Sequence, residues 1–136
     1  MMLRIKRSDF EAIILHARAG LPNEACGLIA GNVVNDIKTI EKVYLLSNPD
    51  SSREHFSIDP TEQLAAVKDM RALGLVPLGN FHSHPATPAR PSDEDIRLSY
   101  DPKASYLILS LAEETPVLKA FGVINGEVTA QPLEFV

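Results

Sequence analysis

Residues 80–95 read NFHSHPATPARPSDED, and this stretch joins an apolar run to the beginning of a helix. The apolar run, residues 76–81, predicts a strand that continues into the stretch. Three prolines among residues 85–91 predict a stiff, irregular loop. Ser92 is a candidate cap for a helix over residues 93–99. The loop lets the chain fold back, so the beginning of the helix can return to the end of the strand.

Two histidines, His82 and His84, stand at the end of this strand. Side chains at positions i and i+2 of a strand point to the same side, so the two imidazoles can bind one ion. Asp95, in the first turn of the helix, can then supply a carboxylate oxygen. Two nitrogens and one oxygen leave the fourth position of a tetrahedral zinc open, as in catalytic sites. A water there would have its pKa lowered to about 7 and become a nucleophile at neutral pH.

Each part of this pattern also has an ordinary structural explanation. A single His-x-His is weak evidence for a metal, and prolines commonly mark turns. Aspartate is favoured in a first helical turn by the helix dipole alone. The combination of strand, rigid loop, Ser92 and Asp95 in this order is what predicts a metal site.

Ser92 has two candidate roles in this arrangement. Its hydroxyl can donate a hydrogen bond to the oxyanion of a tetrahedral intermediate, or it can cap the helix. Losing a cap costs about 1 kcal/mol of stability. Losing an oxyanion donor raises the reaction barrier by about 3 to 4 kcal/mol. The residues leave both roles open, and the variant Ser92→Ala separates them.

The composition limits the fold and the partners. The 136 residues, 45% of them apolar, predict a single domain over residues 1–136. The net charge of −5 argues against nucleic acid, because phosphate binding needs a basic surface. No run approaches the roughly 20 apolar residues of a membrane span, so we expect no membrane association. A single cysteine, Cys26, excludes an intrachain disulfide and favours a reducing, cytoplasmic location.

The remaining pattern predicts a mixed sheet with three helices packed on its faces, an α/β (α+β) fold. Besides the helix at 93–99, helices are expected over residues 9–19 and from Asp59 to Gly74. Residues 3–5 could form a short edge strand. Asn32 is expected in a turn, and Asn125-Gly126 predicts a tight turn. The other strands are expected over residues 25–31, 40–46, 55–58, 76–81, 106–111, 117–124 and 127–130.

Two predictions concern the ends and faces of the helices. Ser8 and Glu11 have the spacing of a capping box at the beginning of the first helix. The second helix has a cap at Asp59 with proline at the first helical position. Its inner face is expected to consist of Leu64, Val67, Met70 and Leu73.

The stretch from His82 to Asp95 resembles a known motif, the JAMM motif of the MPN+ metallo-isopeptidases. The motif reads His-x-His, seven residues, Ser-x-x-Asp, and every element is present here. The family also has an upstream glutamate followed by a glycine and an apolar strand. Residues 24–29, Glu-Ala-Cys-Gly-Leu-Ile, resemble that element.

The resemblance implies a set of roles that composition and spacing do not establish. His82, His84 and Asp95 would bind one Zn²⁺ per chain together with a water. Glu24 would act as general base and acid, and Ser92 would steady the oxyanion. The implied JAMM/MPN fold is a curved mixed β-sheet flanked by helices, similar in shape to the cytidine deaminases.

The compact length of the chain also bears on the implied substrate. Deubiquitinases of this family carry large insertions that hold ubiquitin, and the chain is too short for them. Compact bacterial members are associated with ubiquitin-like sulfur-carrier proteins that end in Gly-Gly. The resemblance therefore implies a metallopeptidase that removes cysteine or an extension from such a carrier. The alternatives are a non-catalytic MPN scaffold and an amidohydrolase acting on another peptide or small amide.

Several other polar residues remain open at this point. Cys26 is expected to be a buried thiol, and His16 to be solvated on the polar side of its helix. Asn48 and Arg53 occupy a loop that could border the site. His55 could lie near a substrate channel, but the sequence alone assigns none of these residues a function.

Overall fold

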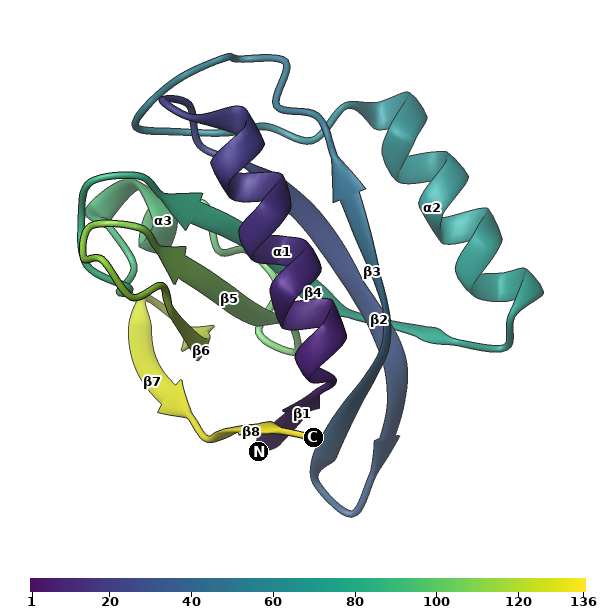
Figure 1. Ribbon diagram of the computed structural model, residues 1–136. Helices are drawn as coiled ribbons and strands as arrows, with labels where there is room; N and C mark the ends of the chain where they lie inside the picture. Colours follow the sequence, from purple (N-terminus) through teal and green to yellow (C-terminus); the bar gives the residue numbers. More distant parts are fainter.

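The computed structural model describes residues 1–136 and has one eight-stranded sheet with three helices (Figure 1). The helices are α1 (Arg7–Gly20), α2 (Pro60–Ala72) and α3 (Asp93–Arg97). The strands are β1 (Met2–Ile5), β2 (Cys26–Val34), β3 (Ile37–Leu46), β4 (Val76–His84), β5 (Ser105–Ser110), β6 (Val117–Ile124), β7 (Glu127–Gln131) and β8 (Leu133–Phe135). The fold is therefore a curved mixed sheet with helices on its faces, which confirms the predicted class.

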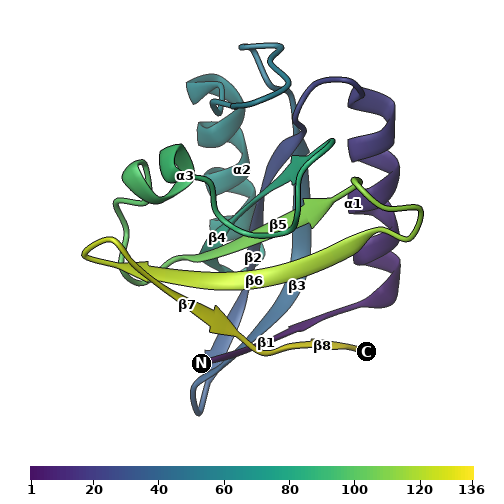
Figure 2. The same ribbon diagram turned by 90° about the vertical axis from the view of Figure 1, so that its left-hand side faces the viewer.

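The order of strands across the sheet is β7-β6-β5-β4-β2-β3-β1-β8. Pairing is parallel between β4 and β5, β1 and β3, and β1 and β8, and antiparallel elsewhere. The two edge strands, β7 and β8, are consecutive in the chain and are separated by Pro132 alone. Both edges of the sheet therefore meet at one corner, and the sheet curls toward itself (Figures 1 and 2).

The central strand β2 divides the core into two layers. Its residue Ile29, like Ala25 immediately before the strand, belongs to the larger apolar cluster, which includes Ile13 and Ala17 of α1. Its alternate residues Cys26, Leu28 and Ala30 pack with Ala66 and Met70 of α2. Side chains alternate across a strand, so α1 and α2 lie on opposite faces, as Figure 2 shows. Helix α3 lies on the same side as α2.

Close packing at β2 explains its small residues. A Cβ on Gly27 would lie 2.0 Å from the carbonyl oxygen of Tyr44 and 2.1 Å from the Phe81 ring. Only a residue without a side chain fits there. The predicted small, buried strand over residues 25–31 is confirmed and extends to Val34.

The helix predictions were right in position and partly wrong in detail. Helix α1 is capped at Lys6 without a side-chain hydrogen bond, so the predicted capping box at Ser8 is wrong. Asp59 caps α2 as predicted, because its carboxylate accepts hydrogen bonds from the next helical amides. The face of α2 that is buried consists of Ala66 and Met70, whereas Leu64 and Leu73 are more than half exposed. Helix α2 covers only part of the sheet, so its apolar residues are not all needed in the core.

Four strand predictions need correction. Strand β1 is interior, because β8 pairs along its outer side. Residues 55–58 form no strand, and Asn32 lies within β2, while the turn comes at Asn35–Asp36 with positive φ angles. The pattern also missed β8, a three-residue strand that is too short for an alternation to be recognised. None of the three helices has the length and apolar character needed to cross a membrane.

Candidate metal centre and active site

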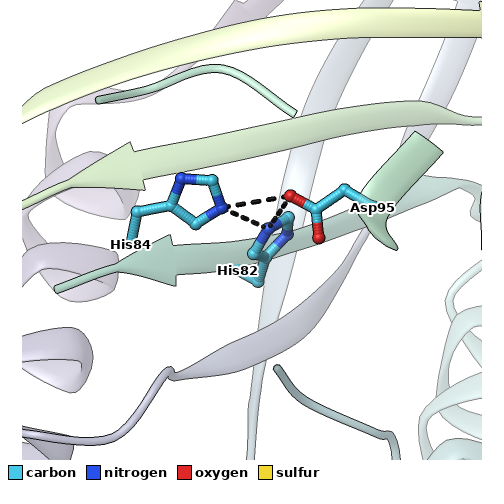
Figure 3. Close-up of side chains that lie close together, drawn as sticks. All are labelled: His82, His84 and Asp95. Carbon is cyan, nitrogen blue, oxygen red and sulfur yellow. Dashed lines mark hydrogen bonds and ion pairs between the residues drawn. The ribbon is translucent and has the colours of Figure 1, made fainter. Parts of the chain in front are cut away.

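Three of the predicted site residues meet at one point (Figure 3). The Nε2 atoms of His82 and His84 lie 3.1 Å apart. The Oδ2 atom of Asp95 lies 3.1 Å from each of them. Both imidazoles are almost fully buried, and the three residues form a group whose ligand atoms could hold a metal ion.

Strand β4 and helix α3 hold these side chains in place by local geometry. His82 and His84 end a strand that is hydrogen-bonded on both sides, to β2 and to β5. Ser92 and Asp95 form a reciprocal capping box at the beginning of α3. The Ser92 hydroxyl oxygen accepts a hydrogen bond from the Asp95 amide at 3.0 Å, and the Ser92 amide donates to Asp95 Oδ2 at 2.9 Å. The carboxylate is therefore aimed at the two histidines by the cap itself.

The position of the proton on the His84 imidazole favours a cation between His82, His84 and Asp95. His84 Nδ1 lies 2.9 Å from the carbonyl oxygen of Pro88, so this nitrogen is the donor and Nε2 carries a lone pair. That lone pair, His82 Nε2 and a carboxylate oxygen then face one another. Two nitrogens bound to one tetrahedral zinc at about 2.0–2.1 Å lie about 3.3 Å apart, close to the 3.1 Å found here. The residues thus fit a small metal ion in both donor type and spacing.

Burial and the ion-pair contacts perturb the pKa of all three residues. Burial lowers the pKa of His82. For His84, burial alone would lower the pKa, but the hydrogen bonds to Asp95 and Pro88 raise it overall. Burial would likewise raise the pKa of Asp95, but the two imidazoles hold it well below its usual range. Asp95 is therefore a permanent carboxylate at neutral pH, which suits a metal ligand.

Glu24 lies beside this group although it is distant in the sequence. Cys26 pairs with His82 across β2 and β4, so the antiparallel register places Glu24 opposite His84 on the same face. The Glu24 side chain is only 5% exposed, and its Oε1 atom is buried without a hydrogen-bond partner. Desolvation by burial raises its pKa to about 8, partly offset by His84 and increased by Asp95. A carboxyl group with such a pKa can both accept and donate a proton near neutrality.

Ser92 has the cap role that the sequence left open, and its hydroxyl hydrogen remains free. Its oxygen accepts from Asp95, so the O–H group can still donate to a ligand from its exposed position. The two roles predicted for Ser92 are therefore compatible with each other.

A cavity of about 470 Å³ opens beside the candidate metal ligands. His82 and Asp95 form one wall, and Glu94 adds a second carboxylate. The remaining lining is mainly apolar and aromatic and comes from α3, the central strands and the loop that precedes α2. These residues include Phe56, Ile58, Leu98, Tyr100, Ile108 and Val123.

The loop at residues 47–58 supplies site residues that sequence reasoning did not assign. The Phe56 ring stacks on the His82 imidazole with centroids 4.6 Å apart and planes at 23°. In the sequence, Phe56 stood out only as an aromatic residue within a mainly polar loop. His55 instead points to the surface and pairs with Asp50 at 3.4 Å. Arg53 is exposed and takes no part in the site.

The two remaining residues that the sequence singled out, Cys26 and His16, are buried or hydrogen-bonded within the fold. Cys26 is a fully buried free thiol, and burial raises its pKa to about 12, so it is not a nucleophile at neutral pH. His16 was expected to be solvated, but its Nε2 lies 2.8 Å from the carbonyl oxygen of Leu46 and 3.2 Å from that of Cys26. It therefore fastens α1 to the ends of two strands, and the prediction for His16 was wrong.

Comparisons of sequence and fold relate this chain to known proteins. The family described as prokaryotic homologues of the JAB domain matches residues 6–122. A CysO-cysteine peptidase of Mycobacterium tuberculosis is 32% identical over 99% of this chain and 92% of its own length. A probable TtuB-protein conjugate cleaving protease of Thermus thermophilus is 34% identical over 71% of this chain and 63% of its own. The solution structure of a Desulfitobacterium hafniense protein is 54% identical, with a TM-score of 0.92 over 99% of this chain and 93% of that one.

Proposed function

Because the chain belongs to the prokaryotic JAB domain family of JAMM/MPN proteins, we propose that it is a zinc-dependent peptidase acting on a ubiquitin-like sulfur-carrier protein. The bond cleaved would be an amide at the C-terminal tail of the carrier, releasing cysteine or an extension. The observation that carries the proposal is the convergence of His82, His84 and Asp95 within 3.1 Å, next to the buried carboxyl group of Glu24.

The donor set supports zinc as the metal. Two imidazole nitrogens and one carboxylate oxygen form a three-residue set that leaves a position for water or substrate. When bound there, zinc would lower the pKa of a water and polarise the carbonyl group of the substrate. The chain itself contributes the buried, pre-formed ligand positions, since the cap at Ser92 fixes Asp95 and the Pro88 carbonyl fixes the His84 tautomer.

Glu24 is the residue that can move the proton. Hydrolysis joins the oxygen of water to the carbonyl carbon and breaks the C–N bond, and one proton must pass from that water to the leaving nitrogen. Glu24 lies on the same face as the ligands, and its Oε1 atom makes no competing hydrogen bond. We assign it the role of general base and then general acid. The free O–H group of Ser92 would donate to the carbonyl oxygen as negative charge develops there.

The substrate class follows from the relatives and from the shape of the site. The relative from M. tuberculosis is named for a CysO-cysteine conjugate, and the one from T. thermophilus for TtuB-protein conjugates. Both ligand histidines are less than 5% exposed, so a bulky chain cannot reach them. An extended tail without large side chains can enter the neighbouring cavity, as a Gly-Gly end would. A cytoplasmic location, which the single cysteine favours, is part of the same proposal.

The test is mass spectrometry of a carrier–cysteine adduct incubated with zinc-loaded protein. We expect the mass of one cysteine residue to be lost with the wild-type chain. The variant Glu24→Gln, which keeps the three metal ligands, should retain zinc and leave the adduct intact.

Two further measurements test the need for zinc and distinguish a carrier protein from a small amide as the substrate. Chelated protein should be inactive and should regain activity on addition of Zn²⁺. An unchanged adduct across a panel of carriers, together with cleavage of small amides, would replace the proposed substrate by a small-molecule one. Equal cleavage by the wild type and Glu24→Gln would reject the assigned role of Glu24.

A further inference from the structure

The main chain at Glu24 and Ala25 is held by hydrogen bonds at every polar atom. The Glu24 amide donates to the carbonyl oxygen of Ser52 at 2.7 Å, and the Glu24 carbonyl oxygen accepts from Asn48 Nδ2 at 3.1 Å. The Ala25 amide donates to Ser83 Oγ at 2.8 Å, and the Ala25 carbonyl oxygen accepts from the Ser83 amide at 2.9 Å. This dipeptide is therefore fixed on both sides, although it precedes the first residue of β2.

These main-chain contacts determine where the Glu24 carboxyl group lies. Its Oε1 atom is buried and makes no hydrogen bond, so no neighbouring donor fixes that atom directly. The β2–β3 ladder ends at the pair Cys26 and Leu46, so no strand carbonyl or amide reaches Glu24 from that side. The side chain of Asn48 takes the place of the missing ladder partner by donating to the Glu24 carbonyl oxygen.

Asn48 makes three further contacts with the loop that precedes α2. Its Nδ2 also donates to the carbonyl oxygen of His55 at 3.0 Å. Its Oδ1 accepts from the amides of Asp50 at 3.1 Å and Ser57 at 3.3 Å. His55 and Ser57 are the two neighbours of Phe56, whose ring stacks on a metal-binding imidazole. One amide side chain thus uses both its donor and its acceptor groups to join Glu24 to the Phe56 segment.

We propose that Asn48 is a positioning residue of this active site. It holds the main chain of Glu24 and the segment around Phe56 in one fixed arrangement, and so places the proton-carrying carboxyl group relative to the metal ligands. The inference rests on the proposed function for the role of Glu24. Asn48 acts through Glu24 and Phe56, and the residue itself contacts no reacting atom.

The chemistry of the amide group explains why asparagine is needed. Aspartate at this position would keep an acceptor for the amides of Asp50 and Ser57 but would lose both donors. Alanine would lose all four contacts. Asn48→Asp therefore removes only the two contacts that Nδ2 donates, to the carbonyl oxygens of Glu24 and His55, whereas Asn48→Ala also removes the two contacts that Oδ1 accepts.

The test combines steady-state kinetics with amide hydrogen exchange on the zinc-loaded protein. The matched control is Asn32→Ala, which removes an exposed asparagine of β2 that makes no side-chain hydrogen bond. Misplacing a reacting group by about 1 Å costs up to roughly 100-fold in rate. We therefore expect both Asn48 variants to lower kcat about 10- to 100-fold with KM within about twofold, and Asn32→Ala to change neither.

Amide hydrogen exchange and zinc content can both be measured without a substrate. The Glu24 amide should exchange at least about tenfold faster in both Asn48 variants, because its segment is then less firmly held. The Ser57 amide should become fast in Asn48→Ala and remain slow in Asn48→Asp. Zinc content should stay at one per chain in both, since none of the three metal ligands bonds to Asn48.

Several outcomes would overturn the inference. A raised KM with unchanged kcat would show that Asn48 contacts the substrate. Unchanged exchange at Glu24 would show that its main chain is held without Asn48. Lost zinc in a variant that remains folded by thermal melting would show a role in metal binding. If the wild type cleaves no carrier at all, the proposed function fails, and the exchange results still decide whether Asn48 holds Glu24.

Discussion

Replacing Glu24 by glutamine should change how the stability of the metal-free protein depends on pH. Burial raises the pKa of the Glu24 carboxyl group to about 8 from its ordinary value of 4.5. Between these two pH values the folded state holds a proton that the unfolded state has released. Stability from this group is therefore full below about pH 4.5 and is lost as the pH rises toward 8.

The size of the effect follows from the change in pKa. Moving a pKa from 4.5 to about 8 corresponds to an upper limit of about 5 kcal/mol. Glu24 also lines a second, smaller cavity of about 250 Å³ that opens to solvent, and screening there lowers the expected effect to about 2 to 4 kcal/mol. Glutamine is neutral throughout this range. Glu24→Gln should therefore be more stable than the wild type by that amount at pH 8, and about equal to it at pH 4.5.

The assay is urea unfolding of chelated wild type, Glu24→Gln and a control, Glu11→Gln, at several pH values from 4.5 to 8. Glu11 is an exposed glutamate of α1, so its replacement should leave the pH dependence unchanged. The two buried histidines are common to all three proteins, so they do not account for a difference between them. Parallel stability curves for the wild type and Glu24→Gln would refute the reasoning. Bound zinc should shrink the difference, because a cation beside Glu24 lowers its pKa.

Three further predictions concern the cap, the metal and the packing of β2. Ser92→Ala should lose about 1 kcal/mol of stability as a cap, and a fall in kcat of about 10²- to 10³-fold in a folded, zinc-loaded sample would establish the oxyanion role. His84→Ala should lose zinc, and elemental analysis showing one zinc per chain would contradict the ligand assignment. Gly27→Ala should destabilise the protein by about 3 kcal/mol or more or leave it insoluble, because the new Cβ would lie 2.0 Å from the Tyr44 carbonyl oxygen. Gly20→Ala is the control, with its nearest neighbour 3.9 Å away, and its melting temperature should be at or above that of the wild type.

The candidate metal-binding group could be predicted from the sequence because its parts are close together along the chain. His82 and Asp95 are 13 residues apart, and the strand, loop and capped helix that join them have local signals. The side-chain period of a strand aligns the two histidines, and the capping box at Ser92 aims the carboxylate. The same kind of short-range information predicted the Asp59 cap of α2 and the turn at Asn125-Gly126.

The sequence did not indicate the residues that complete the site from a distance. Ala25 and Ser83 are 58 residues apart, and their hydrogen bond depends on the register between β2 and β4. Glu24 came only from a family resemblance, and Asn48 and Phe56 had no assigned role. Whether a carboxyl group is buried beside a histidine depends on which segments pair and how the loop packs. Periodicity within one segment carries no information on either point.

The sequence by itself thus determined the grouping of His82, His84 and Asp95, the helices and most of the strands, because neighbouring residues define each of them. Tertiary structure alone decided that β1 is interior, that the two edges of the sheet meet at Pro132, and that Asn48 bridges Glu24 and the Phe56 segment. These features depend on which strands pair and how the loop packs against them, and the pattern within a single segment specifies neither.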